Sequence, residues 1–285
     1  MSPKVWLITG ASSGLGRSLV DSVLARGDRV IATSRILGPI LHLNGTNDNL
    51  RLLQLDITAG VDVLRSIIKE AVGLWGRIDV LVNNGGSCYL GILEEGGSDL
   101  LRKQYEVNVF GLVDVTNACL PYLRAQHEGT IVIIGSRSAW TCETIATMYG
   151  SSKAAVHAIA ETWTVELAQF NIRVLLVEPS AFRTRAVRIP DNYNLSNSIT
   201  AYDTTRELNL QWYAGWDGNQ VGDPDKAMEA VVDVVRGEGA ANGKPWPRYL
   251  ALGKDADRDI RAKCKIMADH LDEWSEVVKR VDFDS

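Results

Sequence analysis

The sequence predicts a doubly wound α/β fold built on a parallel sheet. Short apolar segments alternate along the chain with longer segments of helical periodicity, as strand–helix–strand units require. Several of the apolar segments show no alternation of polar and apolar residues, which is typical of strands covered on both faces. A glycine-rich turn, from Gly10 to Gly16, follows the first of these segments and precedes a helical one.

The segments predicted as strands are short and rich in Val, Ile and Leu. They cover residues 5–9, 29–34, 50–55, 78–82, 130–134 and 172–177. Between them, apolar residues recur at the spacing of a helix face. Helices are therefore expected at residues 15–26, 61–72, 98–126 and 149–170, after Asp223, and at about 255–279.

Regular patterning fails between about residues 181 and 222. This stretch places aromatic side chains among Asn, Thr and Gly, and so many aromatics argue against a disordered segment. An irregular segment of this length is usually functional, so we expect a small substrate-binding lobe here. Its aromatic residues include Tyr193, Tyr202, Trp212, Tyr213 and Trp216.

Composition excludes several classes of protein. The chain has 285 residues, of which 46% are hydrophobic and 23% charged, so it is not a disordered chain. We find no internal repeat, low-complexity tract or dividing linker, and expect residues 1–285 to form a single domain. The net charge of −5 argues against binding to nucleic acid or to an anionic membrane.

The cysteines and histidines indicate no metal site. Cys88, Cys119, Cys142 and Cys264 contain no CxxC pair, and the four histidines are scattered. Free thiols are typical of a reducing compartment. The first ten residues lack the plan of a signal peptide, and their apolar run is too short to span a membrane. The expectation is a cytoplasmic protein.

The glycine-rich turn is the first feature that carries chemistry. Its glycines permit a tight turn and let the backbone approach a phosphate, and the following helix N-terminus favours an anion. A dinucleotide site is the interpretation that this setting favours. The alternative is a tight strand–helix turn that binds no ligand. The residues concerned are Gly10, Ser12, Ser13, Gly14, Leu15 and Gly16.

The second feature is the pair Tyr149 and Lys153. A spacing of four residues puts both side chains on one face of a helix. An ammonium group beside a phenol favours the phenolate, so Lys153 is expected to lower the pKa of Tyr149 and to make a proton-transfer pair with it. Taken alone, such a pair is common, and it favours an amphipathic helix that carries an exposed lysine over a catalytic pair.

Together, these features resemble the short-chain dehydrogenase/reductase family, closely over residues 4–185 and more loosely over 222–252. The resemblance rests on the order of the glycine-rich turn, an Asn-Asn-Gly-Gly run, a serine thirteen residues before the tyrosine, and the Tyr–Lys pair. Two departures are Gly85 for the family's alanine and Ser180 for its glycine. The implied catalytic residues are Ser136, Tyr149, Lys153 and Asn108, with Ser138 as a second choice for the serine.

The resemblance also implies a role for each of these residues. Tyr149 would give a proton to a carbonyl oxygen while a nicotinamide cofactor delivers hydride to the carbon. Ser136 would orient that oxygen, and Lys153 would hold the nicotinamide ribose. Asn108 would hold a water that links the lysine to solvent; otherwise it is an ordinary polar residue within a helix.

The end of the second predicted strand favours NADP(H). NAD-specific proteins of this fold place an acidic residue there, whereas this chain has Ser34 followed by Arg35. A serine removes repulsion toward a 2′-phosphate and an arginine can pair with it. The alternative is a surface arginine. Asp56 matches the family's acid beside the adenine, or else caps a loop. Further cofactor-binding residues implied by the resemblance are Ile57, Asn84, Gly85, Pro179, Phe182 and Thr184, besides Tyr149 and Lys153.

The substrate is expected to be an apolar carbonyl compound or its alcohol. The resemblance places the pocket after the fourth strand, between the catalytic serine and tyrosine, and after the sixth strand. Alternatively, many of these side chains only pack against one another. Besides Ser136 and Tyr149, the expected substrate residues are Tyr89 and Trp140, with Leu90, Cys142, Glu143, Ile145 and the aromatic stretch to Trp216 around them.

The prediction is therefore an NADP(H)-dependent carbonyl reductase or alcohol dehydrogenase. Its partners would be a small-molecule substrate and further copies of itself, as a homodimer or homotetramer, with no nucleic acid, membrane or metal. The rival is a catalytically silent dinucleotide sensor or scaffold, although such proteins usually lose the tyrosine or the lysine. An epimerase or dehydratase of the extended branch fits less well, since its glycine spacing differs from that of Gly10 and Gly14.

Overall fold

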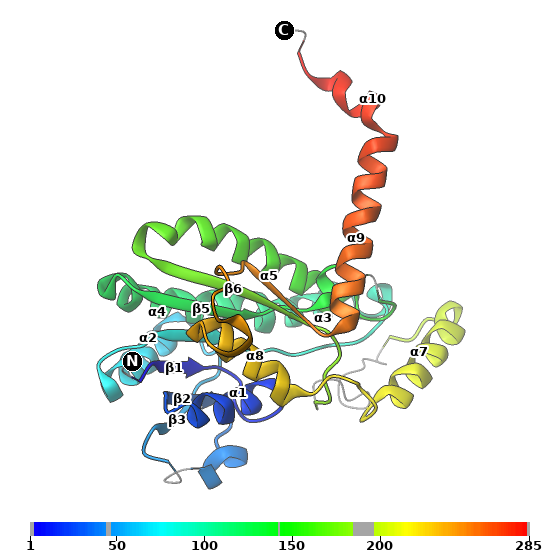
Figure 1. The fold of residues 1–285 in the computed structure, drawn as a ribbon. Coiled ribbons are helices and arrows are strands. Elements are labelled where there is room, and N and C mark those ends of the chain that lie inside the picture. The colour runs from blue at the N-terminus through cyan, green and yellow to red at the C-terminus, as the bar shows by residue number, and fades with distance from the viewer. Residues whose placement is uncertain (1–2, 44–46, 142, 185–196, 284–285) are drawn as a thin grey trace.

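A seven-stranded parallel sheet forms the centre of the molecule (Figure 1). The computed structural model describes residues 3–43, 47–141, 143–184 and 197–283. The strand order β3-β2-β1-β4-β5-β6-β7 reverses direction between β1 and β4, as in a doubly wound sheet. The predicted fold class is confirmed.

The first six strands lie where the apolar segments predict them, with small shifts at their ends. β7, an edge strand, was not predicted. It has four residues, of which only Leu252 is buried, so it lacks the long buried apolar run that marks the other strands. The strands are β1 Val5–Ile8, β2 Arg29–Ser34, β3 Leu50–Gln54, β4 Val80–Asn83, β5 Gly129–Ile134, β6 Ile172–Pro179 and β7 Tyr249–Leu252.

Helices cover both faces of this sheet. One face is covered by α2, α4 and α5, and the other by α1 and α8 (Figure 1). The helices are α1 Gly14–Ala25, α2 Val61–Trp75, α3 Leu93–Tyr105, α4 Gly111–Gln126, α5 Thr147–Glu166, α7 Asp203–Trp216, α8 Pro224–Arg236, α9 Lys254–Glu273 and α10 Ser275–Val278.

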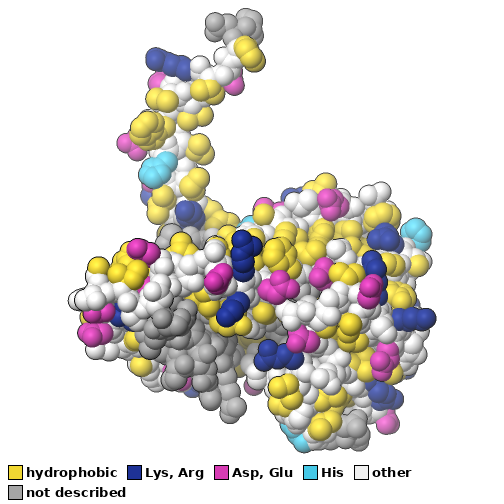
Figure 2. Space-filling view, turned by 180° about the vertical axis from the view of Figure 1, so that it is seen from behind, with side chains coloured by type: hydrophobic (Ala, Val, Ile, Leu, Met, Phe, Trp, Pro, Cys, Tyr) yellow, Lys and Arg dark blue, Asp and Glu magenta, His cyan; other side chains and the backbone are white. Residues whose placement is uncertain are grey.

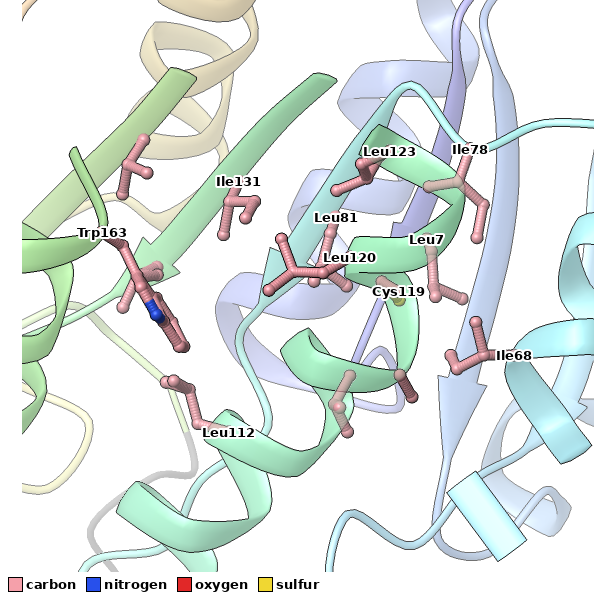
Figure 3. Packing of buried hydrophobic residues seen from close by; sticks show 14 of the residues in the cluster. Leu7, Ile68, Ile78, Leu81, Leu112, Cys119, Leu120, Leu123, Ile131 and Trp163 are labelled. Carbon is pink, nitrogen blue, oxygen red and sulfur yellow. The ribbon is translucent and has the colours of Figure 1, made fainter. Parts of the chain in front are cut away.

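Two cores result, one on each side of the sheet. In β1, Val5 and Leu7 face the α2–α4–α5 core, while Trp6 and Ile8 face the α1–α8 core. Successive side chains of a strand point to opposite faces, so a strand buried on both faces is apolar throughout. Figure 3 shows the first of these cores, in which side chains of α4 interlock with those of the strands and α2.

The segment predicted as irregular contains a regular helix. Residues 203–216 form α7, which stands at the side of the sheet domain in Figure 1. Only Arg206 and Tyr213 of this helix are buried, so its apolar pattern is too sparse to be recognised in the sequence. Tyr193 and Cys142, two residues expected near the substrate, lie outside the described residues.

The C-terminal helix α9 projects away from the rest of the molecule (Figure 1). Ala256, near its start, is its only buried residue. Apolar side chains remain exposed along its length, as Figure 2 shows, and they include Met267 and Leu271. In the described part of the chain, no helix combines the length and the apolar character needed to cross a bilayer.

Candidate active site

One cavity of about 420 Å³ opens at the carboxyl ends of β1, β4, β5 and β6. This is the edge of a doubly wound sheet at which ligands bind, beside the point where strand order reverses. The cavity joins the glycine-rich turn at one end to the Tyr–Lys pair and α7 at the other. Its lining includes Gly10, Ser12, Ser13, Gly14, Leu15, Asn84, Gly85, Ser136, Arg137, Glu143, Tyr149, Lys153, Pro179, Phe182, Thr184, Tyr213, Trp216 and Gln220.

The glycine-rich turn has the backbone that a phosphate cradle needs. Gly10 has a φ of +65°, which favours glycine. Gly16 lies so close to the turn that a Cβ atom there would overlap the Gly10 carbonyl oxygen. Ser13 precedes α1 with an extended backbone and makes no capping bond, and the first turn of α1 contains no acidic residue. The helix N-terminus is thus suited to an anion.

Asn84 and Thr9 hold this turn against the end of β4. The Asn84 side chain donates hydrogen bonds to the backbone oxygens of Thr9 and Gly10, at 2.9 and 3.0 Å. The Thr9 hydroxyl accepts hydrogen bonds from the backbone N–H groups of Asn84 and Gly85. Asn84 therefore shapes the end of the cavity at the glycine-rich turn, by holding the backbone of Thr9 and Gly10 in place.

Tyr149 and Ser136 meet in the middle of the cavity. The Tyr149 hydroxyl and the Ser136 hydroxyl are hydrogen-bonded. Burial raises the pKa of Tyr149, and that effect outweighs the hydrogen bond from Ser136, which lowers it. Lys153 is not among the causes of this shift, so the expected lowering of the Tyr149 pKa by Lys153 stays a prediction.

Lys153 lies beside Tyr149 on the same face of α5. Its Nζ is 5.7 Å from the centroid of the Tyr149 ring and donates a 2.7 Å hydrogen bond to the Ile134 carbonyl oxygen. Burial lowers the pKa of Lys153 to about 8. The ammonium is therefore held next to the phenol by the end of β5, in a poorly solvated place.

Asn108 lies in a short π-helical segment, Glu106–Phe110, that joins α3 to α4. Such segments are common at functional sites. Its side chain is 2% exposed and is fully engaged: it donates to the Ser87 carbonyl and the Ser152 hydroxyl and accepts from the Ser87 N–H. The side chain of Asn108 thus fastens the loop after β4 to α5.

Five of the predicted cofactor residues do not line the cavity. Gly16 belongs to the glycine-rich turn, and the other four lie further along the same edge of the sheet. Ser34 is buried at the end of β2, and the Arg35 side chain after it is exposed and has no ion pair with any described residue. Asp56 accepts hydrogen bonds from the backbone and hydroxyl of Thr58, as a loop cap does. Ile57 packs beside Gly85 and Gly111.

Trp140 and Tyr89, predicted to contact substrate, do not line the cavity. The Trp140 indole donates a 2.6 Å hydrogen bond to the buried Glu178 carboxylate and packs edge-on against His157. Glu178 also bonds His157, and that bond raises the pKa of the imidazole. These partners hold the Trp140 ring outside the cavity. The ring is the first member of a series of side-chain contacts that leads through Glu178 and His157 to β7.

Other expected substrate residues divide between the cavity and the packing around it. Glu143, Tyr213 and Trp216 line the cavity, whereas Leu90 and Ile145 are buried in a small cluster with Tyr213. Trp212 is 52% exposed and stacks on Trp216. The lobe's aromatics thus form both the cavity wall and its support.

A charged triad joins the active-site loop to α9. Arg137, the residue after Ser136, pairs with Glu143 in the cavity and with Asp259 in α9. All three side chains are largely buried. Local sequence carries no signal for this contact, because Arg137 and Asp259 lie 122 positions apart.

A second buried ion pair fastens α7 to α3. The Glu95 carboxylate pairs with Arg206 and accepts a 2.8 Å hydrogen bond from the Ile199 N–H. Arg206 also bonds Asp203 and the Ile199 carbonyl. These contacts hold the segment that carries Tyr213 in place. Within the described residues, no group of three or more His, Cys, Asp or Glu side chains could hold a metal ion.

Comparison with known proteins identifies the family. A family model described as short chain dehydrogenase matches residues 4–191. The chain belongs to the short-chain dehydrogenase/reductase family. This short-chain dehydrogenase/reductase is 31% identical to the uncharacterized oxidoreductase YusZ of Bacillus subtilis, across 82% of this chain and 85% of that one. A short-chain dehydrogenase from Streptomyces avermitilis has a crystal structure with 33% identity and a TM-score of 0.87, covering 99% of this chain and 100% of that one.

More distant structures share the fold and contain either form of the cofactor. A gluconate 5-dehydrogenase from Burkholderia cenocepacia, in complex with NADP and tartrate, has 20% identity and a TM-score of 0.72, with 90% and 96% coverage. A short-chain dehydrogenase/reductase from Burkholderia phymatum, in complex with NAD, has 19% identity and a TM-score of 0.75, with 91% and 92% coverage. Proteins of this fold thus contain either NADP or NAD, so the fold alone does not determine whether a cofactor carries a 2′-phosphate.

Proposed function

We propose that this protein is an NADPH-dependent reductase that converts a ketone or aldehyde of an apolar small molecule to an alcohol. One observation carries the proposal. Ser136, Tyr149 and Lys153 converge in the same cavity that the glycine-rich turn enters, so a cofactor on the turn extends toward the Tyr149 hydroxyl. A bound nicotinamide supplies the hydride.

The chain's own residues then manage the proton and the carbonyl oxygen. Ser136 hydrogen-bonds the substrate oxygen, and Tyr149 donates its proton to that oxygen as the carbon is reduced. The raised pKa keeps Tyr149 protonated at neutral pH, as a proton donor must be. The phenolate that results is stabilised by the neighbouring Lys153 ammonium. Asn108, in the π-helical segment before α4, supports this arrangement through its hydrogen bonds to Ser87 and Ser152.

The preference for NADPH rests on Ser34 and Arg35. Ser34 ends β2 where an acidic residue would repel a 2′-phosphate, and the exposed Arg35 guanidinium is free of protein ion pairs within the described chain. A charge-assisted hydrogen bond to phosphate contributes about 1.5–3 kcal/mol. Asp56 and Ile57 border the expected adenine position on the same edge. Titration of the protein with NADPH and with NADH, followed by fluorescence, tests the preference directly.

The catalytic role is tested by Tyr149→Phe. This change keeps the ring and removes the acid, so turnover of the best ketone or aldehyde substrate should fall by at least ~10²-fold. NADPH affinity should be unchanged. The matched control is Tyr89→Phe, which removes a hydroxyl outside the cavity and should leave turnover intact. A Tyr149→Phe enzyme with wild-type turnover would show that the proton comes from another group.

The rival proposal is a silent dinucleotide sensor. It predicts NADPH binding without oxidation of NADPH by any member of a panel of ketones, aldehydes and quinones. The presence of both Tyr149 and Lys153 in the cavity favours the enzyme. The single domain over residues 1–285, the homodimer or homotetramer and the cytoplasmic compartment are parts of the proposal that rest on sequence; light scattering after size-exclusion chromatography tests the oligomer.

A further inference from the structure

The helices α9 and α10 form a C-terminal arm, residues 254–278, that stands clear of the sheet domain (Figure 1). Ala256 is the only buried residue of the two helices, and every residue from Cys264 to Trp274 is exposed. Helices in proteins draw most of their stability from packing, so an isolated helix of this length is marginal in water. The C-terminal arm therefore lacks the contacts that normally hold a helix.

Apolar side chains form one continuous stripe along the C-terminal arm. They follow one another at alternating intervals of four and three residues. This average of about 3.5 residues is the repeat of a helix that packs lengthwise against a second helix. The stripe consists of Ile260, Cys264, Met267, Leu271 and Trp274, and Val278 of α10 continues the spacing.

The stripe is open to solvent. Met267 is 50% exposed, Leu271 59% and Trp274 57%, and Figure 2 shows apolar side chains along the projecting helix. A contiguous apolar surface of this kind marks an interaction site. Ile266 is 49% exposed but lies outside the stripe, because neighbouring residues point about 100° apart around a helix. The spacing thus selects a helix as the partner, on one defined face.

Charged residues beside the stripe indicate the direction of the partner helix. One side of the stripe carries Arg261 and Lys265 and, further out, Asp272, whereas Lys263 lies on the other side. In an antiparallel pair of identical helices the same sides meet, so Lys265 lies level with the other copy's Asp272. In a parallel pair opposite sides meet, which brings Arg261 and Lys265 to the level of Lys263. The charges therefore favour an antiparallel pair.

The base of the C-terminal arm has a hollow where the tip of an antiparallel copy would lie. This hollow lies between β7 and the first turns of α9, and Ile260 and Cys264 of the stripe line it together with Ala251, Asp257 and Arg261. If Met267 packs against Leu271 of the partner subunit, the repeat places Trp274 of the partner subunit against Cys264. The largest side chain of the stripe then reaches the hollow.

We propose that the C-terminal arm binds the C-terminal arm of a second copy of this chain, in an antiparallel pair related by a two-fold axis. Each stripe covers the other, and each Trp274 packs at the hollow of the opposite arm. The fit is self-complementary, as a two-fold interface requires. The inference goes beyond the proposed reductase function and does not depend on it, since the hollow and the active-site cavity share no lining residue.

Sedimentation velocity of the full chain over a range of concentrations tests the stripe. Met267→Glu combined with Leu271→Glu should raise the dissociation constant at least about 100-fold, because each arm loses two apolar side chains from the interface. If a second surface also associates, the same variant should halve the mass instead. Ile266→Glu is the matched control, which adds a charge at an equally exposed position outside the stripe and should leave association unchanged.

Cysteine cross-linking tests the direction of the pair. Under mild oxidation with oxidised glutathione, Trp274→Cys should form a disulfide-linked dimer with Cys264 of the partner subunit, because the antiparallel register brings these two positions together. Adding Cys264→Ser to Trp274→Cys should abolish that dimer, and the wild type should form none through Cys264. A wild-type dimer linked through Cys264 itself would mean a parallel pair and would overturn the inference.

Other outcomes also decide the proposal. A wild-type chain that stays monomeric at every concentration overturns it, whether the arm then packs on its own sheet domain or binds a different protein. Association that survives Met267→Glu with Leu271→Glu unchanged overturns it as well, because another surface is then responsible. Association lost equally in Ile266→Glu would show that the stripe has no special role. Sedimentation needs neither cofactor nor substrate, so these results are independent of the reductase assay, and thermal melting confirms that each variant is folded.

Discussion

The two ends of the active-site cavity are held by different means. At the cofactor end, the glycine-rich turn is fixed by hydrogen bonds to backbone, made by Asn84 and Thr9 at the end of the neighbouring strand. At the substrate end, α7 is fixed by side chains, through the buried pair of Glu95 and Arg206. The structure of the glycine-rich turn depends on the identity of a few residues in a set order. The position of α7 depends on an ion pair between residues 111 positions apart.

This difference indicates how each end can change. The glycine-rich turn accepts few substitutions, because the backbone atoms that form it must keep their positions for the turn to keep its shape. A lobe held by one ion pair can be replaced as a unit while the sheet keeps its shape. We therefore expect the end with the glycine-rich turn to preserve the family's chemistry, and the lobe to determine the specificity for a substrate.

The largest effect is expected at the substrate end, from Arg206→Met. The change leaves the Glu95 carboxylate buried without its partner, which costs about 3–5 kcal/mol of folding free energy. The melting temperature should fall by several degrees, and KM for the best substrate should rise as α7 loosens. The control is Arg65→Met, which breaks the exposed pair with Asp62 and should change stability by less than about 0.5 kcal/mol. Equal melting temperatures for both variants would contradict the role of this pair.

At the cofactor end, Arg35→Asp should act on one cofactor and not on the fold. The change removes a partner of the 2′-phosphate and adds repulsion, so NADPH affinity should fall by about ten- to a hundred-fold or more, while NADH affinity changes little. Parallel fluorescence titrations measure both. Equal losses for the two cofactors would mean that the end of β2 does not contact the phosphate.

Gly16→Ala should weaken the turn itself. An added Cβ would overlap the Gly10 carbonyl oxygen and the Asn84 side chain, and overpacking of this kind costs about 1–3 kcal/mol. Both NADPH and NADH should bind more weakly, which separates this variant from Arg35→Asp. Gly73→Ala in α2 is the matched control: nothing lies within 4 Å of its added Cβ, so a neutral or slightly stabilising effect is expected. Unchanged binding by Gly16→Ala would show that the turn tolerates displacement.

The smallest effect is a dependence of stability on pH. The hydrogen bond from Arg206 lowers the pKa of Glu95 below its ordinary value, and the Ile199 N–H adds to this. A carboxylate with a lowered pKa stabilises the fold above the unfolded pKa of about 4.3, and this contribution is lost as pH falls through the folded value. The difference in melting temperature between wild type and Glu95→Gln should therefore narrow below about pH 4.3. A constant difference down to strongly acidic pH would contradict this assignment.

Sequence reasoning succeeded where local pattern decides structure. Strands β1 to β6 are buried on both faces, and their apolar residues therefore mark them. The turn from Gly10 to Gly16 was recognisable because its glycines meet a steric need within a few residues. β7 and α7 were missed for the opposite reason, since few of their side chains are buried.

The substrate end was harder to predict because its geometry depends on contacts between distant residues. Trp140 is two positions from Ser138, yet it turns away from the cavity to bond Glu178, 38 positions later. Gln220 was not predicted at all, because a glutamine in a polar loop gives no local sign that its amide is buried. The signal that could have found it is its place between the aromatic segment and Asp223, the start of α8.

The anchoring of α9 has a mechanical consequence. The helix has 20 residues and so extends about 30 Å, and it is fastened near its base by the ion pair that Arg137 makes with Asp259. It therefore acts as a lever whose short arm ends beside Ser136. We expect a lateral load on the exposed end, from a fused tag or a neighbouring molecule, to displace Arg137 and with it the loop that carries Ser136.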